Sequence, residues 1–328
     1  MTRFGRTMMV MALVLGLGAP AARPLAAQES TSEVARRAVD PHKTAAEATQ
    51  NKIDIPHHIG NAHEIELPFG VVWHLPRFEP VHIGGVALDL SPTRHMVFMV
   101  FAAVIVGLVF VLSAGAIAKA QAGGRPAKGF AGTMEATALF IRQEVILPNV
   151  GHHGEGFVPY LLTLFFFILT MNLLGLLPWG ATATGNISVT AALALMAFIT
   201  IEVAGMRTLG AKGYLGTIFY LPHGLPGGIG GTFMKAVLLV IMTPIEIIGK
   251  LAKPFALAVR LFANMTAGHV LVLALIGLTF LFQSWAVGVA SSVMATAIML
   301  LELFVAFLQA FVFTLLTSVF IGLMRAEH

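Results

Sequence analysis

The sequence predicts an all-α membrane protein, and composition, hydropathy and the length of the apolar stretches lead to that prediction. Hydrophobic residues make up 57% of the 328-residue chain and charged residues only 11%, whereas a soluble domain carries about 25% charged residues. Mean hydropathy is +0.85. Several apolar stretches reach the roughly 20 residues that a helix needs to cross about 30 Å of hydrocarbon. There is no cysteine, which excludes disulfides and thiolate metal sites.

The N-terminus has the pattern of an export signal. Arg3 and Arg6 precede an apolar run at residues 8–18, which is too short to span a membrane. We therefore predict a cleaved signal peptide at residues 1–27 and an external, periplasmic polar segment at residues 28–95. Short apolar alternations in the run from His63 to Leu90 predict small strands or a hairpin there. The histidines of this segment could in principle bind a metal, but their spacing fits no standard ligand pattern, and solvated surface histidines are the preferred interpretation.

The membrane domain, residues 96–328, is predicted to hold five spanning helices and one interfacial helix. Basic residues after the first span mark the inner face, so the mature N-terminus lies outside and the C-terminus inside. From residue 232 the chain is apolar for about twice the length of an upright span, and Pro254 kinks a helix rather than ending it. We expect one upright helix, a helix pair and two long, tilted antiparallel helices. The spans are residues 96–118, 158–177, 187–205, 232–282 and 286–324, and the interfacial helix is residues 130–145.

Ionisable side chains are rare in the last two predicted spans. From residue 254 to 324 only Arg260, His269 and Glu302 can carry charge near neutral pH, and Asn264 and Gln309 lie near them in the sequence. An antiparallel hairpin that turns near Ser284 places Arg260 opposite Gln309, and His269 opposite Glu302. Arg260 and Asn264 share a helix face, about 6 Å apart along the axis.

A buried arginine cannot lose its proton, so it needs a cavity, a partner or water. His269 and Glu302 could simply pair with each other inside a helix bundle, but that pairing leaves Arg260 without a carboxylate. Glu246 is an internal candidate, yet it lies 14 residues away, about 21 Å along the helix. A carboxylate on a partner protein is the preferred explanation.

Three stretches resemble one known family. Residues 253–269, Lys-Pro-Phe-Ala-Leu-Ala-Val-Arg-Leu-Phe-Ala-Asn-Met-Thr-Ala-Gly-His, resemble the signature of subunit a of the F-type ATP synthase membrane sector. Residues 308–313 are similar to its second signature, and residues 171–178 to the end of its second span. The resemblance runs from residue 96 to the C-terminus. The chain departs from some relatives at Gly175, where they have an acid, and in its longer external segment.

The resemblance implies a non-catalytic, proton-conducting subunit beside a rotating ring of c subunits, with the two long tilted helices packed against that ring. Arg260 would face the ring carboxylates and separate two offset half-channels. Glu246 would line the inner exit, and the outer entry would be lined by Asn264, His269, Glu302 and Gln309. The implied partners are the c-ring, the peripheral stalk b subunits, the rest of the ATP synthase and the lipid bilayer, in a bacterial inner membrane.

The alternative function is a self-contained proton-coupled secondary transporter. Such folds often contain inverted repeats, and no symmetry between the two halves of this sequence is visible. The sequence also has no Gly-x-x-x-x-Gly-Lys-Ser/Thr loop, so we expect no ATP site in this chain. No cofactor, metal or nucleic acid is expected.

Overall fold

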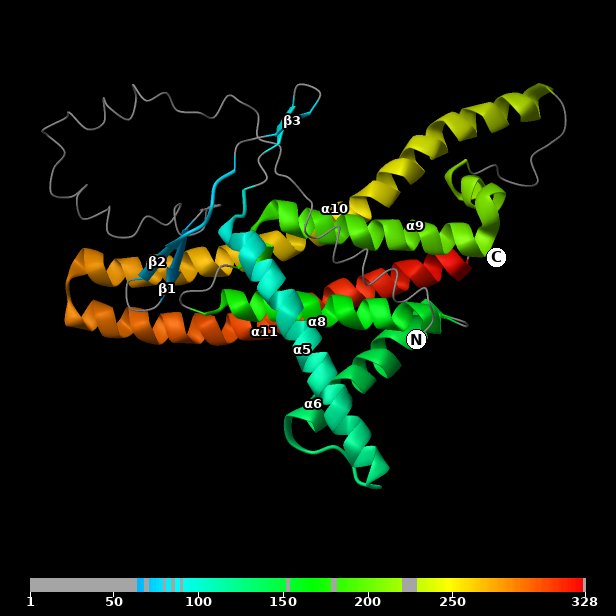
Figure 1. The fold of residues 1–328 in the computed structure, drawn as a ribbon. Coiled ribbons are helices and arrows are strands. Elements are labelled where there is room, and N and C mark those ends of the chain that lie inside the picture. The colour runs from blue at the N-terminus through cyan, green and yellow to red at the C-terminus, as the bar shows by residue number, and fades with distance from the viewer. Residues whose placement is uncertain are drawn as a thin grey trace, which may run out of the picture.

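A computed structural model describes residues 64–67, 71–78, 81–83, 86–88, 91–151, 154–177, 182–219 and 229–326. The predicted signal peptide, residues 1–27, lies outside the described residues, as does most of the predicted external segment. The described part is almost entirely helical (Figure 1). Five helices in it are long and apolar enough to cross a membrane.

Two short antiparallel hairpins precede the helices. Strands β1 (Glu64–Leu67) and β2 (Val71–His74) pair with each other, and so do β3 (Val81–Ile83) and β4 (Val86–Leu88). The prediction of small strands in this segment is confirmed. Ile65 is buried, while Trp73 on the paired strand is 57% exposed.

The five long helices form one bundle, and shorter helical segments join them (Figure 1). Helix α8 packs against α5 and α11, and α9 packs against α10 and α11. The prediction of an all-α membrane protein is confirmed. The helical elements are α5 (Arg94–Ala122), α6 (Gly129–Phe140), the π-helix η2 (Ile141–Ile146), α7 (Leu147–Val150), the 3₁₀ turn η3 (Glu155–Phe157), α8 (Val158–Gly175), the 3₁₀ turn η4 (Ala183–Gly185), α9 (Ile187–Ile218), α10 (Ile229–Phe282) and α11 (Trp285–Ala326).

Local sequence signals fix where two of these helices begin. The Thr93 hydroxyl accepts a hydrogen bond from Met96 N at the start of α5, and the Asn186 side chain caps α9 through Ser188 N. Helix α5 therefore starts two residues before the predicted span. Helix α9 runs 13 residues past the predicted end at residue 205. It contains a break at Gly210, whose φ of 70° suits glycine.

Helices α10 and α11 are a continuous antiparallel hairpin that turns at Gln283 and Ser284 (Figure 1). Helix α10 has 54 residues and contains both Pro244 and Pro254. It bends but does not end there, as predicted, because a proline removes one hydrogen bond without stopping the helix. At 1.5 Å per residue α10 is about 80 Å long. A helix of that length lies within about 30 Å of hydrocarbon only if it is steeply inclined.

Helix α8 is the centre of the packed core. Leu161, Phe165, Ile168 and Met171 on this helix are fully buried. The ring of Phe165 makes edge-to-face contacts with Phe166 and with Phe307 of α11, with centroids 5.0 and 5.7 Å apart. These contacts fix α8 against α11, which carries one half of the predicted site.

The predicted interfacial helix, residues 130–145, corresponds to two different environments. Helix α6 has no buried residue, and Phe130 is 66% exposed, which suits a membrane surface. In the π-helix η2 that follows, Ile141, Val145 and Ile146 are instead packed inside the bundle, while Gln143 and Glu144 are exposed. The sequence prediction missed this because amphipathic spacing alone does not distinguish lipid from a neighbouring helix.

The contact between α7 and the last turns of α11 requires a glycine. A Cβ atom built on Gly322 would overlap the backbone carbonyl of Asn149. We expect Gly322→Ala to separate the two elements and to destabilise the protein by about 1–3 kcal/mol. Thermal unfolding of the detergent-solubilised protein measures this. Gly115→Ala in α5 is the control, because no atom lies within 4 Å of the added methyl, and equal melting temperatures for the two variants would contradict the prediction.

Candidate functional site

Helix α10 presents Arg260 and Asn264 on an exposed face. Leu257, Leu261 and Met265 point into the bundle from the opposite side of the helix. Within the part of the chain that the structure describes, no carboxylate pairs with Arg260 and no hydrogen bond reaches its guanidinium.

Small side chains surround the exposed arginine. On the same face of α10 the structure exposes Ala256, Ala263 and Ala267. Small residues at helical spacing allow another helix to approach closely inside a membrane. A partner helix on this face could bring its own side chain to the guanidinium.

Glu302 of α11 lies directly against Gly268 of α10. A Cβ atom on Gly268 would overlap the carboxylate, so only glycine leaves room for this side chain. The contact confirms the predicted register of the hairpin, since Gly268 precedes His269. Glu302 is 9% exposed, and its Oε1 has no hydrogen-bond partner among the described residues. Gln309, two turns further along α11, is also buried.

His269 turns away from Glu302. Its Nε2 lies 3.4 Å from the hydroxyl of Thr182, at the start of η4. In the described part of the molecule no ion pair or hydrogen bond joins His269 to Glu302. The direct pairing predicted from the hairpin is therefore not formed, because Gly268, and not His269, occupies the helix face opposite the carboxylate.

Several buried polar residues lie close to His269, where α5, α8 and η4 meet. Asn172 of α8 donates to the Ala306 carbonyl of α11 (3.1 Å) and accepts from the Thr184 hydroxyl (2.8 Å). His95 Nδ1 of α5 donates to the Thr182 carbonyl (3.0 Å). The η4 turn thus connects α5 and α8 to His269. The sequence analysis did not identify His95, Thr182 or Asn172, because their relation to His269 arises only when three separate segments meet.

Gly175 has a specific packing role at this end. A Cβ atom at this position would overlap the Thr182 side chain, which in turn contacts His269. The acid that some relatives carry here would not fit beside Thr182. The sequence departure noted at Gly175 is therefore linked to the site itself.

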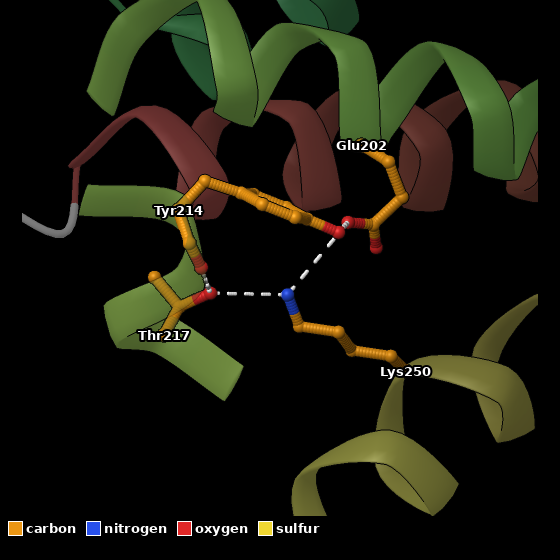
Figure 2. A network of polar contacts seen from close by, with 4 residues as sticks. All are labelled: Glu202, Tyr214, Thr217 and Lys250. Atoms are coloured by element: carbon orange, nitrogen blue, oxygen red, sulfur yellow. Dashed lines mark hydrogen bonds and ion pairs between the residues drawn. The ribbon is translucent and has the colours of Figure 1, made fainter. Parts of the chain in front are cut away.

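Glu246 lies on α10 on the other side of Arg260, and it is half-buried. One helical turn beyond it toward Arg260, Lys250 pairs with Glu202 of α9 (Figure 2). The sequence analysis missed this pair. The available signal was a single carboxylate, Glu202, inside the predicted span 187–205. No group of three His, Asp or Glu residues suited to a metal ion occurs in the segments that the structure covers.

Comparison with known proteins identifies the family. Residues 96–322 match the family described as ATP synthase A chain. The chain belongs to the ATP synthase subunit a family. It is 45% identical to ATP synthase subunit a of Chloroherpeton thalassium over 278 residues, 84% of this chain and 78% of the relative. It is 44% identical to the subunit a of Chlorobium phaeobacteroides (strain BS1) over 98% of this chain and 93% of the relative. With the subunit a of Anaeromyxobacter dehalogenans the identity is 40%, over 95% of this chain and 80% of the relative.

The family match covers all five apolar helices and both halves of the site. It includes the exposed arginine, the glycine–glutamate contact and His269. The resemblance predicted from residues 253–269 and 308–313 is confirmed at the level of the family.

The contact between Gly268 and Glu302 gives a test of the site. We expect Gly268→Ala to displace the Glu302 carboxylate and to slow ATP-driven proton pumping by about tenfold or more, because small displacements of a reacting group cost large factors in rate. Acidification of inverted membrane vesicles, followed by a fluorescent dye, measures the rate. Gly249→Ala on the same helix is the control, since open space surrounds it. Parental pumping by Gly268→Ala would show that the position of Glu302 is unimportant.

Proposed function

We propose that this chain is the proton-conducting stator subunit of an F-type ATP synthase. It provides two offset half-channels and the arginine that couples proton flow to rotation of a ring of c subunits. It is a non-catalytic component of that complex, and nucleotide chemistry belongs to other subunits.

This proposal rests on the exposure of Arg260 and on its lack of a carboxylate partner in the described chain. A permanent cation stands on an exposed face of a membrane helix, next to small residues, without a carboxylate from the described chain. A charged side chain at the bilayer centre costs several kcal/mol unless it is paired or hydrated. A ring of partner subunits that each carry a carboxylate would supply the missing counter-charge in turn.

The same cost explains how the arginine couples flow to rotation. A ring carboxylate facing lipid must be protonated, because a bare charge there is unfavourable. Beside Arg260 the ionised form is stabilised, so each carboxylate releases its proton on arrival and takes another on departure. Protons then cross only when the ring turns.

The outer half-channel is assigned to Asn264, His269, Glu302 and Gln309. Imidazole and carboxylate groups can take up and release protons near neutral pH. The buried, unpartnered Oε1 of Glu302 and the polar contacts around η4 support this assignment. Glu246, about 21 Å from Arg260 along α10, is assigned to the inner half-channel.

The orientation follows from the basic residues. Lys119 near the end of α5, Lys212 on α9 and Arg325 at the end of α11 all follow the apolar part of their helices. The positive-inside rule puts these ends in the cytoplasm and the turn between α10 and α11 at the periplasmic side. In this proposal the protein is a multi-pass protein of a bacterial inner membrane, with c-ring and peripheral stalk b subunits as partners.

No feature of the site supports the alternative, a self-contained proton-coupled transporter. It leaves an exposed Arg260 without a counter-charge, and the family to which the chain belongs argues against it. Co-purification separates the two: a stator subunit is isolated with a c-ring, a transporter alone or as a homo-oligomer.

We expect Arg260→Ala to abolish ATP-driven proton pumping while the complex still assembles, because the ring carboxylates lose the charge that ionises them. Vesicle acidification measures pumping, and native gel electrophoresis of the solubilised complex measures assembly. Lys235→Ala, an exposed lysine near the start of α10, controls for the loss of one positive charge. Coupled pumping that persists in Arg260→Ala would refute the role given to this residue.

We expect His269→Ala and Glu302→Ala each to slow proton entry by about tenfold or more, the usual scale for the loss of a proton-transfer group. The measurement is the rate of pumping per assembled complex. Thr296→Ala on the exposed face of α11 is the matched control. If both variants transport protons at the parental rate, the outer route runs elsewhere in the molecule.

A further inference from the structure

A second charged cluster lies between α9 and α10, away from the site described above (Figure 2). Lys250 Nζ is 3.7 Å from Glu202 Oε2 and donates a hydrogen bond to the Thr217 hydroxyl (3.1 Å). The Tyr214 hydroxyl donates to the same Glu202 oxygen, and the ammonium stands 4.6 Å from the centroid of the Tyr214 ring. Two further side chains, Tyr214 and Thr217, thus contact one ion pair.

The fold of α9 builds this cluster. In a straight helix Tyr214 would lie about 18 Å beyond Glu202 along the axis. The break at Gly210 turns the last part of α9 back, so that Tyr214 and Thr217 reach the pair (Figure 2). Lys250 and Glu202 are 7% and 9% exposed, while Tyr214 and Thr217 are half-buried.

Stability alone does not explain a buried ion pair. Desolvation of two charges offsets most of their attraction, and apolar residues of similar volume often stabilise a protein as well or better. Removal of one partner is different, because it leaves an uncompensated charge in a medium of low polarity. The informative question is therefore what a single unpaired charge would disturb at this position.

Lys250 stands between two groups of the proposed proton route. It is one helical turn from Glu246, about 6 Å along α10, and ten residues from Arg260, about 15 Å. Lys250 points toward α9, and along the helix axis it lies between them, so a proton that leaves the ring beside Arg260 and exits past Glu246 crosses the level of this ammonium. An unpaired cation there would repel the proton, whereas an ammonium paired with Glu202 presents almost no net charge.

We propose that Glu202 is a positioning residue of the inner half-channel: it neutralises Lys250, so that protons can move between Arg260 and Glu246. Tyr214 and Thr217 contact the pair. This inference rests on the proposed function, because it assigns a role only within that proton route. The inference predicts unequal effects of removing the two partners, because an unpaired cation obstructs a proton and an unpaired carboxylate does not.

The test uses the complete ATP synthase in liposomes, with proton uptake driven by ATP and expressed per assembled complex. We expect Glu202→Gln to lower the rate at least about tenfold, since it leaves Lys250 unpaired. We expect Lys250→Met to stay within about threefold of the parent, because Glu202 keeps the Tyr214 hydroxyl as a hydrogen-bond donor. We expect the double variant Glu202→Gln/Lys250→Met to recover to the same range, because replacement of both partners is often neutral. Lys235→Met is the control for removal of a lysine from α10.

Equal losses in Glu202→Gln and Lys250→Met, or no recovery in the double variant, would overturn the inference in favour of a purely structural pair. Parental rates in Glu202→Gln would overturn it as well. If Glu202→Gln does not assemble, Thr217→Lys provides a second test. Thr217 is half-buried, and a lysine there adds a second ammonium next to Lys250, so that Glu202 can neutralise only one of the two. We expect Thr217→Lys to be slow and Thr217→Met to be normal, and equal rates would reject the inference.

The failure of this inference differs from the failure of the proposed function. If Glu202→Gln pumps normally while Arg260→Ala does not pump, the stator function stands and only the role of Glu202 falls. If Arg260→Ala also pumps normally, the proposed function itself is wrong.

Discussion

The arrangement of this protein depends on Arg260, a positive charge in a membrane helix with no carboxylate partner among the described residues. Arg260 cannot become neutral by losing a proton, and hydrocarbon does not solvate it. The described chain gives it neither an acid nor a hydrogen bond. The surrounding alanines leave room for another helix to approach α10 closely. The hairpin of α10 and α11 places His269 and Glu302 on one side of Arg260 along the helix, and Glu246 on the other. In the proposed function these features serve a counter-charge that approaches Arg260 from outside the chain.

The most densely buried part of the molecule is centred on helix α8. Helix α8 is buried along its length and holds α11 through aromatic contacts and through the hydrogen bond from Asn172 to Ala306. The η4 turn then fixes Thr182 beside His269, and Gly175 makes room for it. Proton-transfer groups are effective when their neighbours hold them in place. The packed helices therefore hold the side chains of the candidate site in position, as supporting side chains do around the active site of a soluble enzyme.

Much of this could be predicted from the sequence, because membrane spans and rare charges are strong signals. The spans, the continuity of α10 through Pro254 and the register of the hairpin all follow from apolar length and residue spacing. The details that failed are contacts between distant segments. His269 was expected to face Glu302 and instead contacts Thr182, because a shift of one residue turns a helical side chain by 100°. The buried side of the π-helix η2 and the reversal of α9 after Gly210 likewise depend on contacts with segments distant in the sequence, which no local pattern reveals.

Lys250 and Arg260, two of the four Lys and Arg residues of α10, differ in burial and in counter-ion. Lys250 is buried and carries its counter-ion within the chain, from Glu202. Arg260, about 15 Å further along the same helix, is exposed and has no internal counter-ion among the described residues. An open charge in hydrocarbon is the more expensive arrangement. In the proposed function the exposure of Arg260 has a use, because it lets each ring carboxylate approach the guanidinium and leave it again.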